Sequence, residues 1–526
     1  MSIYKLAVII KNPLNDEEFL AVKQIRPRKF GIEEYDSYID SDLWDFPSVQ
    51  LSILQGESEI QVEGAELCAS KLDLKKFDLG LALNQISEQV GIERLVEGQW
   101  KFWKFVEEPE FGPGPPIHTV FITGYYGVDD KSCDDLQNSF SDDLLSITLS
   151  LLQEYPLGVR LVPMESRTGK PFSTTNLVVI APQLVANRES GKGFIAHGDA
   201  LIIDPGCKSR LHQELADIIA ALPRKLVVFV THHHPDHVDG LSAIQKCNPD
   251  AILLAHENTM HRIGKDDWSL GYTPVAGGEE INIGGQRLQV IFAPGHTDGH
   301  MALLHVNTYS LIVGDHCVGQ GSAVLDAFSG GNMREYFNTT YKFLELSPNT
   351  LIPMHGRVNL WPKHMLCRYL KNRRDRESSI LSAIENGSTT LFGIVSTIYK
   401  DVDRVLWFVA ASNVRLHVEH LAQQHKLPEG MSLTKFHRTF GFHFAINWIW
   451  AYTCNWISSK VMKIRRPKLI VLAVVACFVA LYCSLGSLSM FALENSSFLE
   501  DVTVIQISLA SSIKLSGYGS ETLAIG

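Results

Sequence analysis

The stretch THHHPDH, residues 231–237, decides the fold of this 526-residue chain. It follows the run KLVVFV (225–230), which has the length and the apolar, β-branched composition of a buried strand. Four of its residues have the spacing H-x-H-x-D-H, namely His232, His234, Asp236 and His237. Chance would give this pattern in a chain of this composition on the order of once in a thousand. Because imidazole and carboxylate groups bind divalent metals such as zinc, the stretch predicts a metal site at the end of a strand.

Other short apolar runs bounded by Gly or Pro surround this stretch and have the length of buried strands. They are ALIIDPG (200–206), KLVVFVTH (225–232), AILLAHE (251–257), QRLQVIFAPGH (286–296), MALLHV (301–306), SLIVGD (310–315) and TLIPMHG (350–356). The segments 208–222 and 334–346 have helical spacing of apolar residues. Residues 161–365 are therefore predicted to form a layered α/β domain.

The ends of these strands supply further potential ligands. His296, Asp315 and His355 each stand directly beyond an apolar run, and Asp204 ends another run. Because sites in layered α/β proteins collect at the carboxyl edges of strands, we expect all four near the 231–237 stretch.

In this order the residues resemble the motifs of the metallo-β-lactamase superfamily: an Asp, H-x-H-x-D-H, a His, an Asp and a His. The resemblance implies the αββα sandwich of that superfamily and two divalent metal ions, for which zinc is favoured over manganese and iron. It implies a first metal site of His232, His234 and His296 and a second of Asp236, His237 and His355. Asp315 would bridge the two ions, and Asp204 would orient ligands by hydrogen bonding without binding metal.

Such a pair of ions lowers the pKa of bound water from about 15.7 toward about 7 and clamps the oxygens of the attacked group. Asp236 would hold the resulting hydroxide and accept its proton, so we expect hydrolysis of an ester, thioester, amide or phosphodiester. The segment PGHTDGH (294–300) is similar to the corresponding sequences of the glyoxalase II and beta-lactamase-like protein 2 branches. Histidines without a motif position, and Cys317, are predicted to be structural: His233, His256, His261, His300, His305 and His316.

The region 366–430 resembles the winged-helix appendage of the beta-lactamase-like protein 2 family, in which the lactamase-type domain cleaves single-stranded RNA. A helix begins within YLKNRRDRESSIL (369–381), and a short strand is expected at 405–409. Four basic residues on that helix would contact an RNA backbone: Lys371, Arg373, Arg374 and Arg376. Taken alone, they would indicate only a solvated helix face.

Residues 1–160 resemble a Nudix domain in outline, through DLWDFPSVQLS (42–52) and DLGLALNQISEQVGI (78–92). The four positions that would hold magnesium in a working Nudix box read Asn84, Gln85, Glu88 and Gln89, and three of them are neutral. We therefore predict a degenerate, non-catalytic α+β domain that serves in packing or docking.

The last part, 431–526, contains an uncharged stretch at 469–493 that is long enough to span a bilayer and follows a basic flank. A membrane span is slightly favoured over a buried helix or an error in the gene model. No signal or transit peptide is recognised at the start, so an intracellular protein is expected, cytoplasmic or organellar, with a membrane anchor if 469–493 inserts.

Composition narrows the function further. The net charge is −11, from 47 Lys and Arg against 58 Asp and Glu, so any RNA binding must come from a local patch and be salt-sensitive. The nine cysteines include no C-x-x-C pair, which indicates a reducing compartment and argues against cysteine-ligated zinc. Three functions remain: a metal-dependent endoribonuclease, a glyoxalase II-like thioesterase acting on a small glutathione thioester, and a non-catalytic scaffold. The endoribonuclease is favoured, and the oligomeric state is left open.

Overall fold

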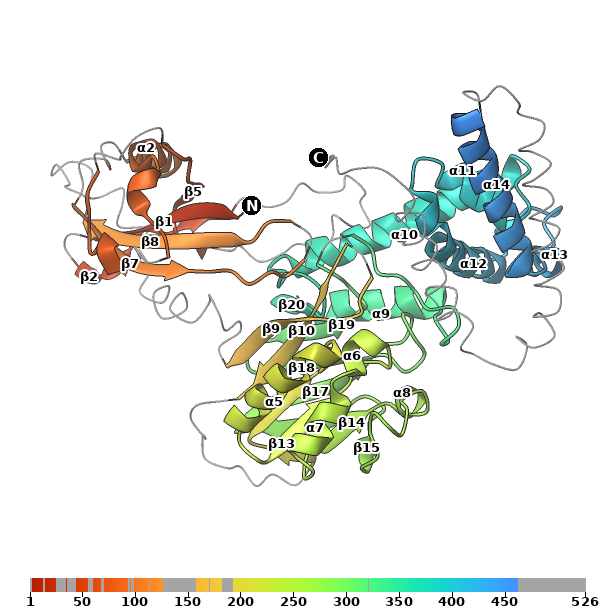
Figure 1. Cartoon of the computed structure of the whole chain (residues 1–526), viewed down its shortest axis with the longest axis horizontal. Helices are drawn as coiled ribbons and strands as arrows, with labels where there is room; N and C mark the ends of the chain where they lie inside the picture. The colour runs from red at the N-terminus through yellow and green to blue at the C-terminus, as the bar shows by residue number, and fades with distance from the viewer. Residues whose placement is uncertain are drawn as a thin grey trace. The chain divides into compact units, whose positions relative to one another are not determined.

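The structure is a computed structural model (Figure 1) that describes residues 2–461 except 13–14, 25–34, 36–43, 55–59, 68–70, 93–94, 96–98, 113, 126–157, 170, 182–192 and 320. The chain divides into two compact units, Met1–Thr439 and Phe440–Gly526. The first contains three regions, which are taken in turn below. The stretch 469–493 lies outside the described residues, so its membrane span stays a prediction.

The central region is a sandwich of two six-stranded sheets. The first sheet has the order β15-β14-β13-β12-β10-β9, with strands Tyr272–Pro274, Ile252–Ala255, Leu226–Phe229, Ala200–Ile203, Thr174–Ile180 and Val159–Glu165. The second has the order β11-β16-β17-β18-β19-β20, with strands Phe194–Gly198, Glu280–Ile283, Gln286–Phe292, Met301–His305, Ser310–Gly314 and Thr350–Pro353. Every apolar run expected to form a strand contains one of these strands.

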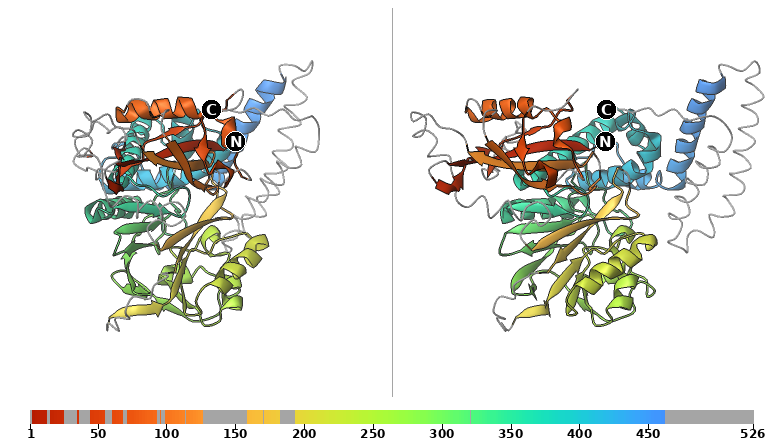
Figure 2. Two further views of the ribbon diagram at one scale, coloured as in Figure 1. Left: turned by 90° about the vertical axis from the view of Figure 1, so that its left-hand side faces the viewer. Right: turned by 60° about the vertical axis from the view of Figure 1, so that its left-hand side comes forward.

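Helices cover both outer faces, as Figures 1 and 2 show. Side chains such as Phe229 of β13 and Leu303 of β18 meet in one fully buried cluster between the sheets. A second cluster joins the first sheet to helices α5 (His212–Ala221) and α7 (Leu241–Cys247). A third joins the second sheet to α9 (Met333–Leu346) and α10 (Pro362–Glu385). The expected αββα layering is confirmed.

The C-terminal helical region follows as α10, α11 (Leu391–Ile398), α12 (Trp407–Gln423) and α13 (Leu433–His437). The prediction of a strand at 405–409 is wrong, because these residues lie in a 3₁₀ turn (Arg404–Leu406) and in the start of α12. The Asp403 side chain accepts a hydrogen bond from the Val405 N–H at this start. The buried residues then recur with helical spacing, at Trp407, Ala410, Ala411, Val414, Val418 and Leu421.

The N-terminal region has a mixed sheet of order β2-β1-β8-β7-β6, to which β5 adds by pairing with β1. These strands are Asn15–Phe19, Ile3–Asn12, Ile117–Tyr125, Gln99–Val106, Val62–Glu63 and Ser48–Gln50, and β3 (Val22–Lys23) pairs with β4 (Trp44–Asp45). Helix α2 (Leu79–Val90) buries Leu83 and Ile86 in the same core. Asn84, Gln85, Glu88 and Gln89 lie on α2, and none of them is buried. The α+β character is confirmed, and the Nudix likeness stays a prediction.

The second unit contributes one described helix, α14 (Phe442–Val461). Across the described part of the chain, no helix combines the length and the hydropathy that a membrane crossing requires.

Candidate metal centre

The first cluster consists of three histidine nitrogens at the edge of the sandwich. His232 and His234 follow β13, and His296 follows β17. The His232 Nε2 atom lies 2.9 Å from His234 Nδ1, and His296 Nε2 lies 3.2 Å from each of them. Two nitrogens that each bind a tetrahedral zinc ion at 2.0–2.1 Å would be about 3.3 Å apart. The triangle therefore has the size of one metal site.

The second cluster consists of Asp236, His237, Asp315 and His355, which lie beside the first. His355 Nε2 is 3.4 Å from both Asp236 Oδ2 and Asp315 Oδ1. His237 Nε2 is 3.8 Å from Asp236 Oδ2 and 3.5 Å from Asp315 Oδ1. Three of these atoms, His237 Nε2, Asp315 Oδ1 and His355 Nε2, are buried without a hydrogen-bond partner. Because buried polar atoms are normally paired, their convergence indicates a place for a cation.

Each ligand histidine uses its other ring nitrogen for a contact that fixes the ring. In the second cluster, His237 Nδ1 contacts Asp204 Oδ2 at 2.9 Å, and His355 Nδ1 contacts the Thr174 carbonyl at 2.9 Å. In the first cluster, His296 Nδ1 contacts the Val324 carbonyl at 2.6 Å, and His232 Nδ1 contacts the Thr231 hydroxyl at 3.0 Å. His234 uses its Nε2 atom, which contacts Asp326 Oδ2 at 3.1 Å. These contacts select the tautomer that leaves the inner nitrogen available to a metal. The residues therefore fit the pair of ions that the sequence implies.

Asp204 lies where the sequence places it, next to the ligands and fully buried. Its carboxylate accepts hydrogen bonds from the Thr231 N–H (2.7 Å) and hydroxyl (2.6 Å) as well as from His237. It contacts His237 at the nitrogen opposite the cluster, so its geometry suits orientation of that ligand. The backbone beside it is tightly packed: a Cβ at Gly206 would lie 1.7 Å from the Asp236 carbonyl oxygen, so only glycine fits.

Asp315 is held by a histidine that the sequence assigns no metal position. The Asp315 N–H donates to His300 Nε2 (3.1 Å), and His300 Nδ1 donates to the Ala293 carbonyl (3.0 Å). The structural role expected of His300 is consistent with these bonds. The Asp315 carboxylate lies in the second cluster, and its charge also acts on His232 and His296 of the first. A bridging role stays a prediction.

The two clusters differ in their electrostatics. Burial, aided by the neighbouring imidazoles, lowers the pKa of His232 and of His296 well below its ordinary value. Burial would also lower the pKa of His237, but Asp315, Asp236 and Asp204 raise it well above its ordinary value. Against the same burial effect, Asp315 and Asp236 raise the pKa of His355 to about 10. The second cluster thus attracts positive charge.

Asp326, which holds His234, is a site residue that sequence reasoning missed. It lies in the segment between β19 and α9, without an apolar run before it, so the strand-end rule does not find it. It also groups with His233 and His234 as potential ligand atoms at the rim of the site. His233 belongs to neither main cluster, and its Nε2 contacts the Ser329 hydroxyl (3.1 Å). Cys317 is fully buried, which raises the pKa of its thiol.

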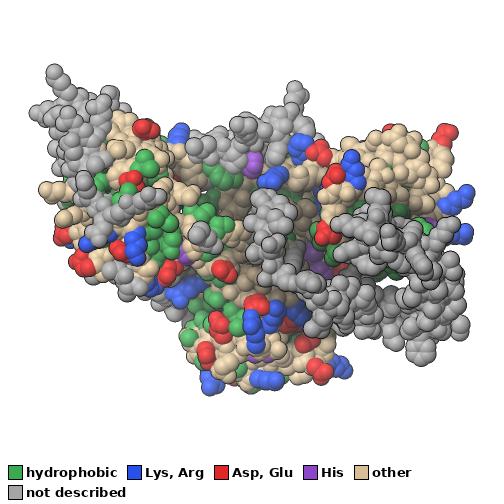
Figure 3. All heavy atoms as spheres, turned by 45° about the horizontal axis from the view of Figure 1, so that its top comes forward, with side chains coloured by type: hydrophobic (Ala, Val, Ile, Leu, Met, Phe, Trp, Pro, Cys, Tyr) green, Lys and Arg blue, Asp and Glu red, His purple; other side chains and the backbone are tan. Residues whose placement is uncertain are grey.

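The four basic residues of α10 do not form one strip. Arg373 is only 6% exposed, so its expected RNA contact is wrong: the guanidinium lies in the protein interior. The helical period turns Arg373 and Arg376 away from Lys371 and Arg374. Arg376 and Arg374 stack over the rings of Tyr399 and Phe337, at 4.4 and 4.5 Å, and Lys371 pairs with Asp375 at 2.6 Å. On the face shown in Figure 3, basic and acidic side chains are interspersed.

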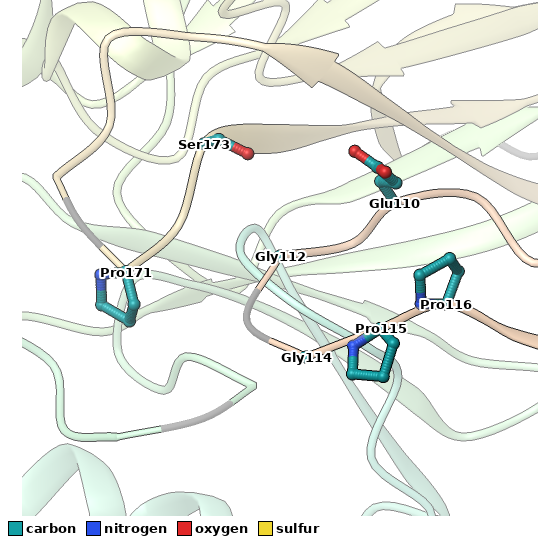
Figure 4. A pocket seen from close by; sticks show the side chains of 7 residues that line it. All are labelled: Glu110, Gly112, Gly114, Pro115, Pro116, Pro171 and Ser173. Atoms are coloured by element: carbon teal, nitrogen blue, oxygen red, sulfur yellow. The ribbon is translucent and has the colours of Figure 1, made fainter. Parts of the chain in front are cut away.

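A pocket lies between the N-terminal region and the central region (Figure 4). It is lined by Glu110, Gly112, Gly114, Pro115, Pro116, Pro171 and Ser173. Phe172, between the last two, has its ring 5.5 Å from that of His355. Arg357, two residues after His355, bonds to the Glu108 carboxylate (2.5 and 2.8 Å) and to the Pro115 carbonyl (3.0 Å). The N-terminal region thus contributes a wall near the candidate centre.

Comparison with known proteins agrees with this geometry. Residues 193–355 match the metallo-beta-lactamase superfamily, and residues 390–432 match the beta-lactamase associated winged helix domain. The central region of the chain therefore contains a metallo-β-lactamase domain. The chain is similar to the beta-lactamase-like protein 2 homologues of Drosophila melanogaster and Caenorhabditis elegans, with 28% identity over 212 residues and 26% over 199. These matches cover 38% and 37% of this chain and 69% and 64% of the relatives.

The chain is also similar to solved structures. A metallo-beta-lactamase family protein of Thermus thermophilus is 17% identical, with a TM-score of 0.40 over 51% of this chain and 94% of that one. A beta-lactamase domain protein of Burkholderia ambifaria is 19% identical, with a TM-score of 0.43 over 52% and 88%. The sheet topology and the family match define the fold of the central region.

Proposed function

We propose that this protein is a two-metal hydrolase that cleaves single-stranded RNA. The observation that supports the hydrolase most strongly is the pair of adjacent ligand clusters, one of which holds three buried and unpartnered ligand atoms. His232, His234 and His296 would hold one ion, which we propose to be zinc. Asp236, His237 and His355 would hold the other, with Asp315 between the two.

When bound, two such ions would lower the pKa of water toward about 7 and neutralise charge on the attacked phosphodiester. The chain's own contribution begins with Asp236, whose side chain is 14% exposed at the cluster. Burial would raise the pKa of Asp236, but His237 and His355 outweigh burial and hold that pKa well below its ordinary value. The carboxylate is therefore ionised at neutral pH and would accept the proton of the attacking water.

Support for RNA as the substrate comes from helix α10 and from an exposed aromatic ring between β19 and α9. Lys371 and Arg374 share one face of α10 and keep 28% and 38% of their side chains exposed, so they could contact a phosphate backbone. Phe328, 62% exposed and two residues from Asp326, offers a ring on which a base can stack. The N-terminal region would act as a non-catalytic docking module.

The test offers the full-length, zinc-loaded protein single-stranded RNA and a glutathione thioester in parallel. The variants Asp236→Asn and His234→Ala should reduce RNA cleavage by about a hundredfold or more, because each removes a ligand or the proton acceptor. His261→Ala, at an exposed histidine outside both clusters, is the matched control and should cleave as wild type does.

The outcomes separate the three functions. Cleavage of the thioester alone would establish the glyoxalase II-like thioesterase instead. Metal binding without cleavage of either substrate would favour the scaffold. RNA cleavage that persists unchanged in both variants would exclude the nuclease assignment.

A further inference from the structure

The segment 321–331, here called the 321–331 loop, connects β19 to α9 and holds two of the three histidines of the first cluster. Its Val324 carbonyl accepts from His296 Nδ1, and its Asp326 carboxylate accepts from His234 Nε2. The Asp326 N–H also donates to the His296 carbonyl (2.9 Å). The position of this loop therefore sets the direction in which both rings point.

The loop is tied to the C-terminal helical region by one buried guanidinium. Arg373 Nη2 donates to the Ala323 carbonyl at 2.5 Å, and Nη1 donates to Asn413 Oδ1 of α12 at 3.1 Å. The same guanidinium lies 4.8 Å from the centre of the Tyr336 ring. Burying a charged group is costly unless it is paired. The Arg373 Nε atom has no hydrogen-bond partner among the described residues, so the two Nη contacts and the ring contact are what define one position for Arg373.

Tyr336 extends the connection to the neighbour of one further ligand, Asp315, and also packs beside His296. Its hydroxyl donates to the His316 carbonyl (2.6 Å), directly after Asp315. Its backbone packs against Gly295, directly before His296, so closely that a Cβ on Gly295 would lie 2.5 Å from the Tyr336 Cα. Arg373 therefore contacts the loop on one side and stacks on a residue packed behind the ligands on the other.

We propose that Arg373 is a positioning residue for the first cluster, through which α10 and α12 fix the 321–331 loop and the orientation of His234 and His296. The inference rests on the metal-binding part of the proposed function and is independent of RNA as the substrate. The inference also assigns a role to Arg373, whose burial excludes it from contact with RNA.

The experiment titrates the metal-free, full-length protein with Co²⁺, whose absorption bands distinguish a tetrahedral three-histidine site from a site rich in carboxylate. Arg373→Met, which keeps the length of the side chain but removes its donors, should weaken binding at the first cluster about tenfold or more. The second cluster should change by less than about threefold, and Arg373→Lys should lie between wild type and Arg373→Met. Arg376→Met, which loses a similar stacking contact on the same helix, is the matched control and should bind as wild type does.

A purely structural role would predict something different, namely a lower unfolding temperature with both clusters weakened alike. A double-mutant cycle with Asp326→Ala separates the two, because residues acting through one loop give non-additive losses. If Arg373→Met does not fold, Arg373→Lys takes its place in the cycle.

First-cluster binding that is unchanged in Arg373→Lys and Arg373→Met, or additive losses in the cycle, would overturn the proposal. A wild-type protein that binds no Co²⁺ would overturn it together with the proposed function. Normal Co²⁺ binding without RNA cleavage would remove only the RNA assignment.

Discussion

Raising the pH from about 6.5 to about 7.5 should strengthen metal binding at the second cluster far more than at the first. The perturbation acts on protons that a metal ion must displace, since a histidine binds metal only in its neutral form. In the second cluster, Asp315 and Asp236 outweigh burial and hold the pKa of His355 at about 10, and with Asp204 they raise that of His237 well above its ordinary value. Both rings are therefore protonated throughout this pH range when no metal is bound.

The magnitude follows from counting those protons. Each histidine whose pKa lies well above the pH contributes about a tenfold gain in apparent affinity per pH unit, so two contribute about a hundredfold. The sign is positive because protons compete with the metal, and their competition weakens as the pH rises. In the first cluster, burial lowers the pKa of His232 and of His296 well below its ordinary value, so these two rings are already neutral and add no gain.

The assay combines Zn²⁺ titration against a competing chelator with calorimetry in buffers of different ionisation enthalpy. About two protons should be released per ion bound at the second cluster. Asp204→Asn removes one of the charges that raise the pKa of His237, and should lower both the proton release and the pH slope. A second-cluster affinity that is equal at the two pH values, with no proton release, would refute the electrostatic reasoning.

Three further predictions concern the site and its surroundings. Gly206→Ala should lower the free energy of unfolding in urea by about 3 kcal/mol or more and abolish metal binding, because its Cβ would lie 1.7 Å from the Asp236 carbonyl oxygen. Gly271→Ala, where the Cβ meets open space, should leave the free energy of unfolding nearly unchanged. Phe328→Ala should weaken RNA binding by about 1–3 kcal/mol while Phe328→Tyr keeps it, and equal binding by both would exclude stacking. Asp78→Ala should cost about 1 kcal/mol in thermal unfolding without changing hydrolysis, because Asp78 accepts from the Leu81 N–H at the start of α2; an unchanged unfolding temperature would contradict that role.

The sequence predicted the strand-end positions well because each ligand directly follows an apolar run. His296, Asp315 and His355 stand beyond β17, β19 and β20, and local pattern alone therefore placed them at one edge. The superfamily resemblance then sorted the expected ligands into two sites. In the structure His232, His234 and His296 lie together, as do Asp236, His237 and His355, and their assignment to two metal ions stays a prediction.

What the sequence missed depends on contacts between distant segments. Asp326 meets His234 across 92 residues, and Arg373 meets Ala323 across 50. A basic residue on a helix is usually solvated, so only the packing of α9 and α12 against α10 reveals that Arg373 is buried. The strand expected at 405–409 failed for a local reason, because a five-residue apolar run does not distinguish a strand from the first turns of a helix.

Both clusters draw ligands from both sheets of the sandwich. Four ligands follow β13 of the first sheet, and three follow β17, β19 and β20 of the second. A bound ion would therefore join the two layers, as a disulfide joins two strands, although all four cysteines whose pairing the structure describes are free thiols. An ion present at about a thousand times its dissociation constant adds about 4 kcal/mol to the free energy of unfolding. The protein's lifetime in a cell would then follow the supply of free metal, so metal starvation would remove the protein itself as well as its activity.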